Sequence, residues 1–403
     1  MQVERIETSR NLWPGLSGKI GVEQIFDGAM AKSEPERPMA QLTGLDCRGG
    51  YYFLGDNQTS DTRRPQGVAF YDDLAVNSWY YRSGTNADRC KLTFLDRASG
   101  KLRDVIPLTP QNGRFRSIYS HAGGIGIAGD YLYITDDETC SIRVFCLRDC
   151  YPLTENPGVL ATSEVLATSF TYFLPQVGQI FLSTPNQATI SYMAIMPEGF
   201  LVGNFYDPDL SGFQNGGKSM IWHAPCNFGP VEFVFPGSMS QQFEPLFPSG
   251  PSAGLTVSRI QGALLLGGKL IINRSWSVAT KQLLILDTYD PEAYFCGTAA
   301  APKTHHETNW LYGCEGLCLV GDKIATVTEF VNQRQITLWG RDAMLALASG
   351  EMTIEQHSAR VAALWAQANA VQAEATVYES QVNCAIEKGL TGFNRSMFVD
   401  DCI

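Results

Sequence analysis

The chain has 403 residues, 44% of them hydrophobic, and a formal net charge of −11. This length and composition indicate a folded protein with one large domain or two ordinary ones. The negative charge argues against binding to nucleic acid, whose phosphates need a basic surface, and against adsorption to an anionic membrane.

No stretch approaches the roughly 20 consecutive apolar residues of a membrane helix, and the opening residues 1–10 carry no apolar leader. The sequence as given predicts a cytoplasmic location, with a secreted mature form that has lost its leader as the alternative. The 11 cysteines do not decide between these two. Cys140, Cys146 and Cys150 lack the paired spacing of a structural zinc site.

The first 54 residues are expected to lie around, and to complete, a larger domain formed by the rest of the chain. Residues 1–41 are polar and contain prolines, which suggests a segment that wraps the outside of the domain. Residues 42–54 are apolar and glycine-rich, and we expect them to supply a strand that pairs with the last repeat of the domain.

Residues 42–348 contain a repeated pattern in which a glycine or small residue leads into an apolar strand, a tight polar turn and a second apolar strand. Its five occurrences lie 54 to 70 residues apart and begin at Gln66-Gly67, Gly123-Gly124, Ser191-Tyr192, Gln261-Gly262 and Glu315-Gly316. Strands with alternating apolar residues follow, as in residues 91–96 and 141–147. Units that cannot bury their own faces must stack beside copies of themselves, and radial stacking closes a β-propeller. We therefore predict an all-β fold with five blades.

Six blades are the alternative, because residues 150–190 are long enough to contain a further unit. We interpret residues 171–178 instead as outer strands of an enlarged second blade.

The C-terminal residues 349–403 have a different character. Thr353 and Gln356 form a capping box, apolar residues recur at helical spacing from Val361 to Ala385, and Gly389 is a plausible stop. This predicts a long amphipathic helix that packs on its own domain in a monomer. A coiled coil that makes a dimer is the alternative.

Polar residues at corresponding places in the repeats predict a small-molecule site. The first strand of each blade lines the central channel of a propeller, so residues near the repeat starts converge on one axis. One tier contains Gln66, His121, Ser191, Gln261 and Glu315. A second tier, at the ends of the paired strands, contains Asn77, Asp136, Asn204, Arg274 and Glu329.

Three of these residues are predicted to be catalytic and the other seven to bind substrate. His121 suits a general base or metal ligand, Glu315 an acid, base or ligand, and Arg274 an anion clamp. A divalent metal in the channel fits this set, and the cofactor is otherwise left open. The structural alternative is that these groups cap strands and hold channel water.

Other motifs carry weaker signals. Residues 207–218 open like a calcium loop but have Lys218 at the position of the final Glu, which favours a turn stabilised by Asp side chains. His305 and His306 are interpreted as part of a solvated loop. The aromatic residues Trp79 to Tyr81 suit either stacking on a ligand or the apolar layer between blades.

Several segments resemble a group of actinobacterial, mostly secreted β-propeller proteins. The resemblance covers roughly residues 60–340 and is carried by residues 121–125, 130–134, 142–145, 173–178, 191–193, 260–262, 315–317 and 328–329. It implies a propeller and no particular activity. The chain departs from the group in its start and in its C-terminal helix.

The sequence supports two functions. The first is an enzyme that transforms a small polar or aromatic-containing metabolite in the channel, by hydrolysis, elimination or cyclisation. The second is a non-catalytic propeller that binds carbohydrate or a partner protein through its loops. The repeats differ at equivalent loops, and this irregularity favours a single site and an enzyme.

Overall fold

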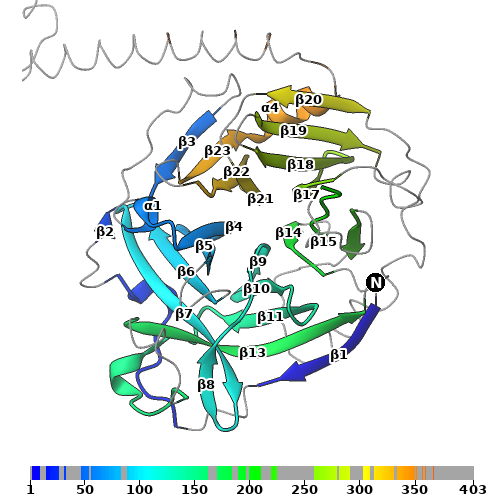
Figure 1. Cartoon of the computed structure of the whole chain (residues 1–403). Coiled ribbons are helices and arrows are strands. Elements are labelled where there is room, and N and C mark those ends of the chain that lie inside the picture. Colours follow the sequence, from blue (N-terminus) through cyan, green and yellow to red (C-terminus); the bar gives the residue numbers. More distant parts are fainter. Residues whose placement is uncertain are drawn as a thin grey trace, which may run out of the picture.

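The computed structural model describes residues 2–9, 15–26, 31–32, 47–53, 56–82, 89–161, 170–183, 189–196, 199–209, 219–224, 258–278, 281–290, 303–308, 313–330 and 334–349, with single positions at 351, 356, 359 and 366. Most of this part is β-strand, and the strands form groups that radiate from a common centre (Figure 1). The fold is all-β and β-propeller-like.

A 12-stranded sheet combines the first two groups of strands. The first group is β4 (Arg63–Tyr71), β5 (Leu74–Tyr81), β6 (Cys90–Asp96) and β7 (Lys101–Gln111). The second is β9 (Ile125–Ala128), β10 (Tyr131–Asp136), β11 (Ser141–Cys146) and β13 (Tyr172–Ser183). Residues 172–175 of β13 run parallel to residues 105–108 of β7, and this pairing joins the outer strands of the two groups.

Short elements surround these strands. They are β1 (Gln2–Thr8), β2 (Ala31–Lys32), β8 (Arg114–Ser117), β12 (Tyr151–Pro152), the helix α1 (Asp56–Thr59) and the 3₁₀ turns Val22–Gln24 and Leu153–Glu155. β1 pairs with the outer edge of β13, so this N-terminal strand lies on the outside of the second group. The pairing of β13 with β11 places residues 176–181 at the outer side of that group, whereas residues 172–175 pair with β7 of the first group.

Three further sheets follow along the chain. One contains β14 (Tyr192–Met196), β15 (Gly199–Gly203) and β16 (Ile221–Ala224). The next contains β17 (Ile260–Leu266), β18 (Lys269–Val278), β19 (Lys281–Tyr289) and β20 (Thr304–Thr308). The last contains β21 (Cys314–Val320), β22 (Lys323–Thr328), β23 (Gln335–Gly340) and β3 (Cys47–Tyr52). His305 and His306 therefore lie in a strand, and not in the predicted loop, because β20 completes the edge of its sheet.

The ring of sheets is closed by an N-terminal strand. β3 runs antiparallel to β23, with Tyr52 opposite Gln335 and Gly50 opposite Thr337. The two strands come from opposite ends of the domain's sequence, so their pairing ties its start to its end. This confirms the prediction that residues 42–54 supply the closing strand.

The first strands of successive groups form the inner layer. Within the described residues, β4 contacts β9, β9 contacts β14, β14 contacts β17, β17 contacts β21, and β21 returns to β4. Figure 1 shows these strands nearest the centre.

Glycine at the repeat starts permits this close approach. A Cβ added to Gly124 would lie 2.3 Å from the amide nitrogen of Met193 in β14, and one added to Gly262 would lie 2.7 Å from that of Leu317 in β21. Real Cβ atoms essentially never come within 3.0 Å of a neighbour. The repeated glycine is therefore a packing requirement of the inner layer.

One-residue bulges mark three inner strands, at residues 65–68 of β4, 260–262 of β17 and 315–318 of β21. A bulge adds one unpaired residue and reverses which face the following side chains occupy. Hydroxyl groups on the second strands hold the bulged backbone. Ser78 Oγ accepts a hydrogen bond from the Gly67 amide at 2.9 Å, and Thr326 Oγ1 donates to the Gly316 carbonyl at 2.9 Å.

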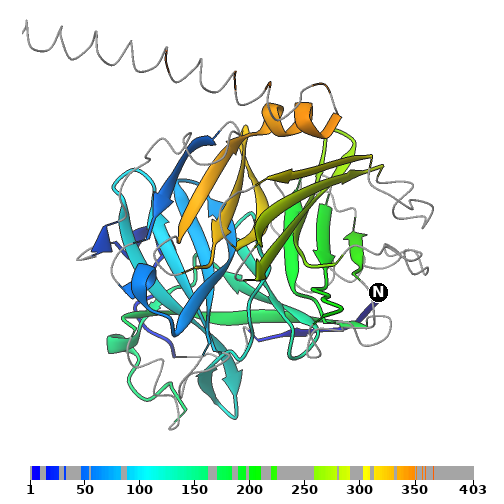
Figure 2. The same cartoon turned by 45° about the horizontal axis from the view of Figure 1, so that its top comes forward.

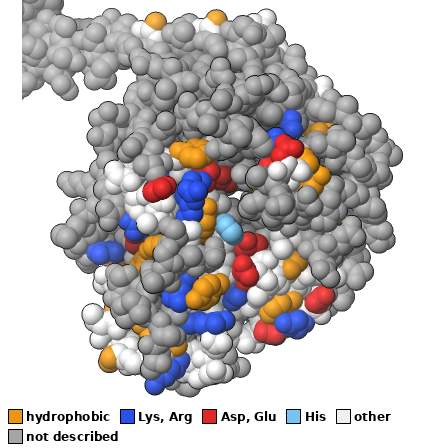
Figure 3. All heavy atoms as spheres, viewed as in Figure 1, with side chains coloured by type: hydrophobic (Ala, Val, Ile, Leu, Met, Phe, Trp, Pro, Cys, Tyr) orange, Lys and Arg blue, Asp and Glu red, His pale blue; other side chains and the backbone are white. Residues whose placement is uncertain are grey.

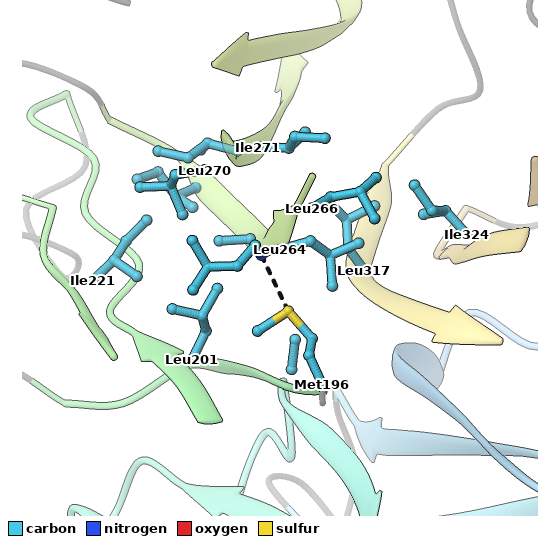
Figure 4. Close-up of a cluster of buried hydrophobic side chains, with 14 of the residues drawn as sticks. Met196, Leu201, Ile221, Leu264, Leu266, Leu270, Ile271, Leu317 and Ile324 are labelled. Carbon is cyan, nitrogen blue, oxygen red and sulfur yellow. Dashed lines mark hydrogen bonds between the residues drawn. The ribbon is translucent and has the colours of Figure 1, made fainter. Parts of the chain in front are cut away.

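Apolar side chains fill the space between sheets. Figure 4 shows one such cluster, where residues of β14, β15, β17, β18 and β21 meet and Met196 Sδ accepts a hydrogen bond from the Leu265 amide at 3.1 Å. The helix α4 (Arg341–Ser349) directly follows β23 and covers this cluster with Met344 and Leu345 (Figure 2).

The sequence analysis did not predict α4. The predicted helix of residues 353–389 lies outside the described residues apart from single positions. No helix in the described part of the chain is long and apolar enough to cross a lipid bilayer.

Candidate functional site

Polar side chains gather at the end of the ring where first strands begin and second strands finish. Antiparallel pairing brings these two ends together, because Arg64 of β4 lies opposite Tyr80 of β5, and Cys314 of β21 lies opposite Thr328 of β22. In Figure 3 a histidine side chain lies near the middle of one face of the molecule, with acidic and basic side chains around it. Six residues, Arg64, Tyr80, His121, Asp137, Glu315 and Glu329, are called the acid–imidazole cluster below.

Glu315 is the most deeply buried carboxyl of this cluster. It is 5% exposed at the bulge of β21, and Gln261 Nε2 of the neighbouring sheet donates a hydrogen bond to its Oε1 at 3.2 Å. Burial raises the pKa of Glu315 well above its ordinary value, and the charge of Glu329 raises it further. A raised pKa favours the protonated form of this carboxyl, and in that form it can donate a hydrogen bond.

Glu329 forms an ion pair at the end of β22. Arg64 Nη1 lies 3.2 Å from Glu329 Oε2, with side chains that are 17% and 12% exposed. Burial raises the pKa of Glu329, and Arg64 opposes this effect. The Arg64 guanidinium also lies 5.4 Å from the centre of the Phe330 ring, a favourable position for a cation.

His121 is oriented by a carboxylate. Its Nδ1 lies 2.9 Å from Asp137 Oδ2, and its main-chain amide donates to Asp137 Oδ1 at 3.0 Å. Burial opposes ionisation of Asp137, but hydrogen bonds from His121 and Ser120 outweigh burial and lower its pKa. The His121 side chain is 40% exposed. When Nδ1 carries the proton shared with Asp137, Nε2 is left with the lone pair that a general base needs.

Tyr80 connects the imidazole to the carboxyl groups. Its ring centre lies 4.5 Å from that of His121. Burial first, and then the charge of Glu329, raise the pKa of Tyr80 to about 12, with a smaller effect of Glu315. The phenol therefore remains protonated at neutral pH between His121 and the two glutamates.

The interaction of Asp137 with His121 leads to a testable prediction about stability at low pH. Because its folded-state pKa is lowered, its contribution to stability is present at neutral pH and is lost as pH falls through about 4 and below. Asp137→Asn should cost about 1 kcal/mol at pH 7 and flatten the acid side of the stability profile, as measured by urea unfolding between about pH 2 and 7. Asp72→Asn, in an exposed turn, is the control. An unchanged acid profile in Asp137→Asn would contradict this role.

Three residues predicted to bind substrate have structural partners instead. Asn77 and Asn204 are fully buried; Asn77 donates to the Gly67 carbonyl at 3.0 Å, and Asn204 Oδ1 accepts from the Met220 amide at 2.6 Å. Asp136 is also fully buried and lies 2.6 Å from Arg143. These corrections have one cause: the side chains point into the sheets, where they satisfy main-chain or guanidinium groups.

The remaining predicted residues take different places. Gln66 lies at the bulge of β4, where its Nε2 donates to the Pro65 carbonyl at 3.0 Å. Ser191 Oγ accepts from the Phe205 amide at 3.1 Å, which is a capping bond. Arg274 lies in β18 opposite Ile260, and the guanidinium that reaches Glu329 is that of Arg64. Of the ten predicted residues, the cluster includes three, His121, Glu315 and Glu329, and Gln261 contacts it.

The sequence analysis missed three members of the cluster. Arg64 precedes the bulge, and Asp137 follows the predicted Asp136 by one position. Tyr80 was considered only among general aromatic contacts, together with Trp79, which is fully buried, and Tyr81. The available signal was sequence proximity: each residue lies within three positions of a predicted one. Side-chain direction was the missing information, because the side chains of neighbouring residues in a strand point to opposite faces of the sheet.

The calcium-like segment contains a turn that is held by an Asp side chain. Asp207 is 1% exposed and forms an ion pair with Arg259 at 3.0 Å, while its Oδ1 accepts from the Asp209 amide at 3.0 Å. This agrees with the predicted Asp-stabilised turn. Among the described residues, no group of three or more His, Cys, Asp or Glu side chains is placed to hold a metal ion. A divalent metal stays a prediction.

The comparisons with known proteins leave the family open. No protein-family model matches the chain, and no curated protein matches it. The resemblance to actinobacterial propellers therefore stays a prediction.

Solved structures with a similar outline include a PQQ-bound aldose sugar dehydrogenase from Streptomyces coelicolor, with 12% identity, a TM-score of 0.38, and coverage of 77% of this chain and 99% of that one. A putative glucose dehydrogenase from Thermus thermophilus has 12% identity and a TM-score of 0.34 over 77% of this chain and 100% of that one. A nidogen/laminin complex has 9% identity and a TM-score of 0.34 over 71% of this chain and 84% of that one. Likenesses of this level assign no activity to the chain.

Proposed function

We propose that the protein is a five-bladed β-propeller that binds a small polar molecule at the acid–imidazole cluster and transfers protons to and from it. One observation carries the proposal: a partly exposed imidazole, oriented by a carboxylate, packs against Tyr80 at the same end of the ring as the buried Glu315, whose pKa burial raises. The five first strands, each in contact with the next, support the number of blades.

Opposite pKa shifts favour acid–base chemistry over a purely structural role. Burial raises the pKa of Glu315, whereas hydrogen bonding lowers the pKa of Asp137. Sites in which neighbouring environments push the pKa values of carboxyl groups apart commonly separate an acid from a base. In this assignment His121 Nε2 removes a proton from the bound molecule and Glu315 donates one.

The other members of the cluster would orient the ligand. Arg64 and Glu329 together present donors and acceptors for polar groups, and the Tyr80 ring offers an apolar face. A neutral or weakly charged polyol, or a polar aromatic compound, fits this mixture better than a strong anion, because the cluster contains three acidic side chains. Hydrolysis, elimination and cyclisation are the reactions to test first.

The experiment is a ligand screen against the wild-type protein, His121→Ala and His223→Ala. Thermal shift with a panel of sugars, polyols and aromatic metabolites should give compounds that stabilise the wild type and His223→Ala, and that fail to stabilise His121→Ala. Product analysis then tests turnover. Metal analysis of the same samples tests the predicted divalent metal. Binding that is unaffected by His121→Ala would contradict the proposed site, and binding without turnover would support the alternative of a non-catalytic binding protein.

A further inference from the structure

Arg334 is a buried arginine at the closure of the ring. It is 0% exposed, and its guanidinium donates three hydrogen bonds to main-chain carbonyls. Nε bonds the carbonyl of Glu329 at 2.9 Å, Nη1 that of Asn57 at 3.0 Å and Nη2 that of Arg63 at 2.6 Å. One side chain therefore joins the end of β22 to α1 and to the start of β4.

The main chain of Arg334 strengthens the same junction. Its amide donates to Gln58 Oε1 at 2.8 Å, and its carbonyl accepts from Gln58 Nε2 at 3.2 Å. The Phe53 amide, just after β3, donates to the same carbonyl at 3.2 Å. The bonds to Phe53, Asn57 and Gln58 therefore link the two distant ends of the domain's sequence.

The burial of this charge has an energetic cost. Burying a guanidinium is unfavourable, and an apolar pair of similar volume usually closes a seam equally well. Burial and the neighbouring charges of Arg64 and Arg63 lower the pKa of Arg334 to about 10. Its Nε contact is with the residue whose carboxyl belongs to the acid–imidazole cluster.

We propose that Arg334 is a positioning residue, which fixes the Glu329 carboxyl in the cluster by anchoring the Glu329 main chain to the closed ring. This inference rests on the proposed function, because Glu329 is part of that site. Arg334 acts through the backbone and through its charge, and it is not expected to contact the ligand.

Several charged and titratable groups lie around Glu329, so a test must separate the effect of Arg334 on the pKa of Glu329 from the effects of the others. Those that influence its titration are Arg64, Arg82, Arg334, Glu315 and Tyr80. Arg64 contacts the carboxyl directly, so substitutions of Arg334 leave this ion pair in place and report on positioning and on the Arg334 charge.

The test is the titration of Glu329 in Arg334→Gln and Arg334→Lys, followed by NMR of ¹³C-labelled glutamate carboxyl groups and assigned with Glu329→Gln. Arg334→Gln should move the Glu329 titration upward, because the Arg334 charge lowers the pKa of that carboxyl, and Arg334→Lys should restore part of this shift. Arg143→Gln is the matched control, because Arg143 is also a buried arginine, 7% exposed and bonded to Asp136. It should lose stability without moving the Glu329 titration.

An unchanged Glu329 titration in Arg334→Gln would overturn the proposal and leave Arg334 with a purely structural role.

A second variant covers the case in which Arg334→Gln does not fold. Gln58→Ala removes two hydrogen bonds to the Arg334 main chain and keeps every charge. The Glu329 amide, which donates to the Gly313 carbonyl at 3.0 Å, should then exchange at least about tenfold faster with deuterium, and unchanged protection would also overturn the proposal. None of these measurements uses a ligand. A ligand screen that finds no binding would therefore reject the proposed function, whereas the titration and hydrogen-exchange results would still test the positioning role of Arg334.

Discussion

Glu315→Gln is expected to be more stable than the wild-type protein at about pH 8 and to lose proton-transfer activity. The folded state raises the pKa of Glu315, so folded molecules bind this proton more tightly than unfolded ones. The contribution of Glu315 to stability therefore falls as pH rises from about 4.3, the ordinary value, through the folded-state value. Glutamine has the same shape, carries no charge and can still accept the hydrogen bond from Gln261.

The same substitution removes the only proton that Glu315 can donate. General acid catalysis contributes about 10²- to 10⁴-fold to a reaction rate, and a loss of that size is expected for turnover of the compound identified by the ligand screen. Higher stability together with lower activity is the pattern of a residue retained for function at a cost in stability.

Glu329→Gln provides the matched control. This side chain is paired with Arg64 at 3.2 Å, so its removal leaves a largely buried guanidinium without its counter-charge and should give no gain in stability at about pH 8. Urea unfolding of both variants between about pH 5 and 9 separates the two cases. A Glu315→Gln variant that is less stable than the wild type under these conditions would show that Glu315 is ionised and structurally required.

Gly124→Ala is expected to destabilise the protein by about 3 kcal/mol, at the upper end of the usual cost of overpacking. The added methyl group would lie 2.3 Å from the Met193 amide nitrogen and 2.6 Å from the Tyr192 carbonyl carbon. Both are main-chain atoms of β14, so the clash cannot be relieved by a side-chain rotation. The inner strands β9 and β14 would have to separate.

Gly129→Ala separates this effect from the general cost of replacing glycine. Gly129 has a positive φ of 55° and open space around its Cα, so alanine there is strained only by its backbone conformation and should cost about 1 kcal/mol. Urea unfolding measures both variants. Equal losses in the two would contradict the view that the repeated glycine sets the spacing of the inner strands.

The repeat pattern predicted most of the fold because each repeat combines a local signal with a packing need. Gly67, Gly124 and Gly262 mark places where neighbouring strands nearly touch, and residues 42–54 were predicted as the closing strand because they are apolar and glycine-rich. The junction of β13 with β7 was not predictable in this way. This parallel pairing joins the outer strands of two different groups. No repeated sequence pattern indicates which outer strands will pair in this way.

The predicted site residues divide between the acid–imidazole cluster and the interior of the sheets. His121, Glu315 and Glu329 were expected at this end of the ring because antiparallel strands bring repeat starts and strand ends together. Asp136 and Asn77 were expected there too, but they point into the sheet. Alternation of side chains fails next to a bulge or turn, and sequence alone does not place the extra residue.

The proposed role of Glu315 as an acid depends on the rise in its pKa that burial causes. A titration of ¹³C-labelled glutamate carboxyl groups, with the Glu315 signal assigned by its absence in Glu315→Gln, measures this directly. One carboxyl signal that titrates well above the ordinary glutamate range and disappears in that variant is the predicted result. A Glu315 signal that titrates in the ordinary range, near about pH 4.3, would contradict the assignment of an acid at this site.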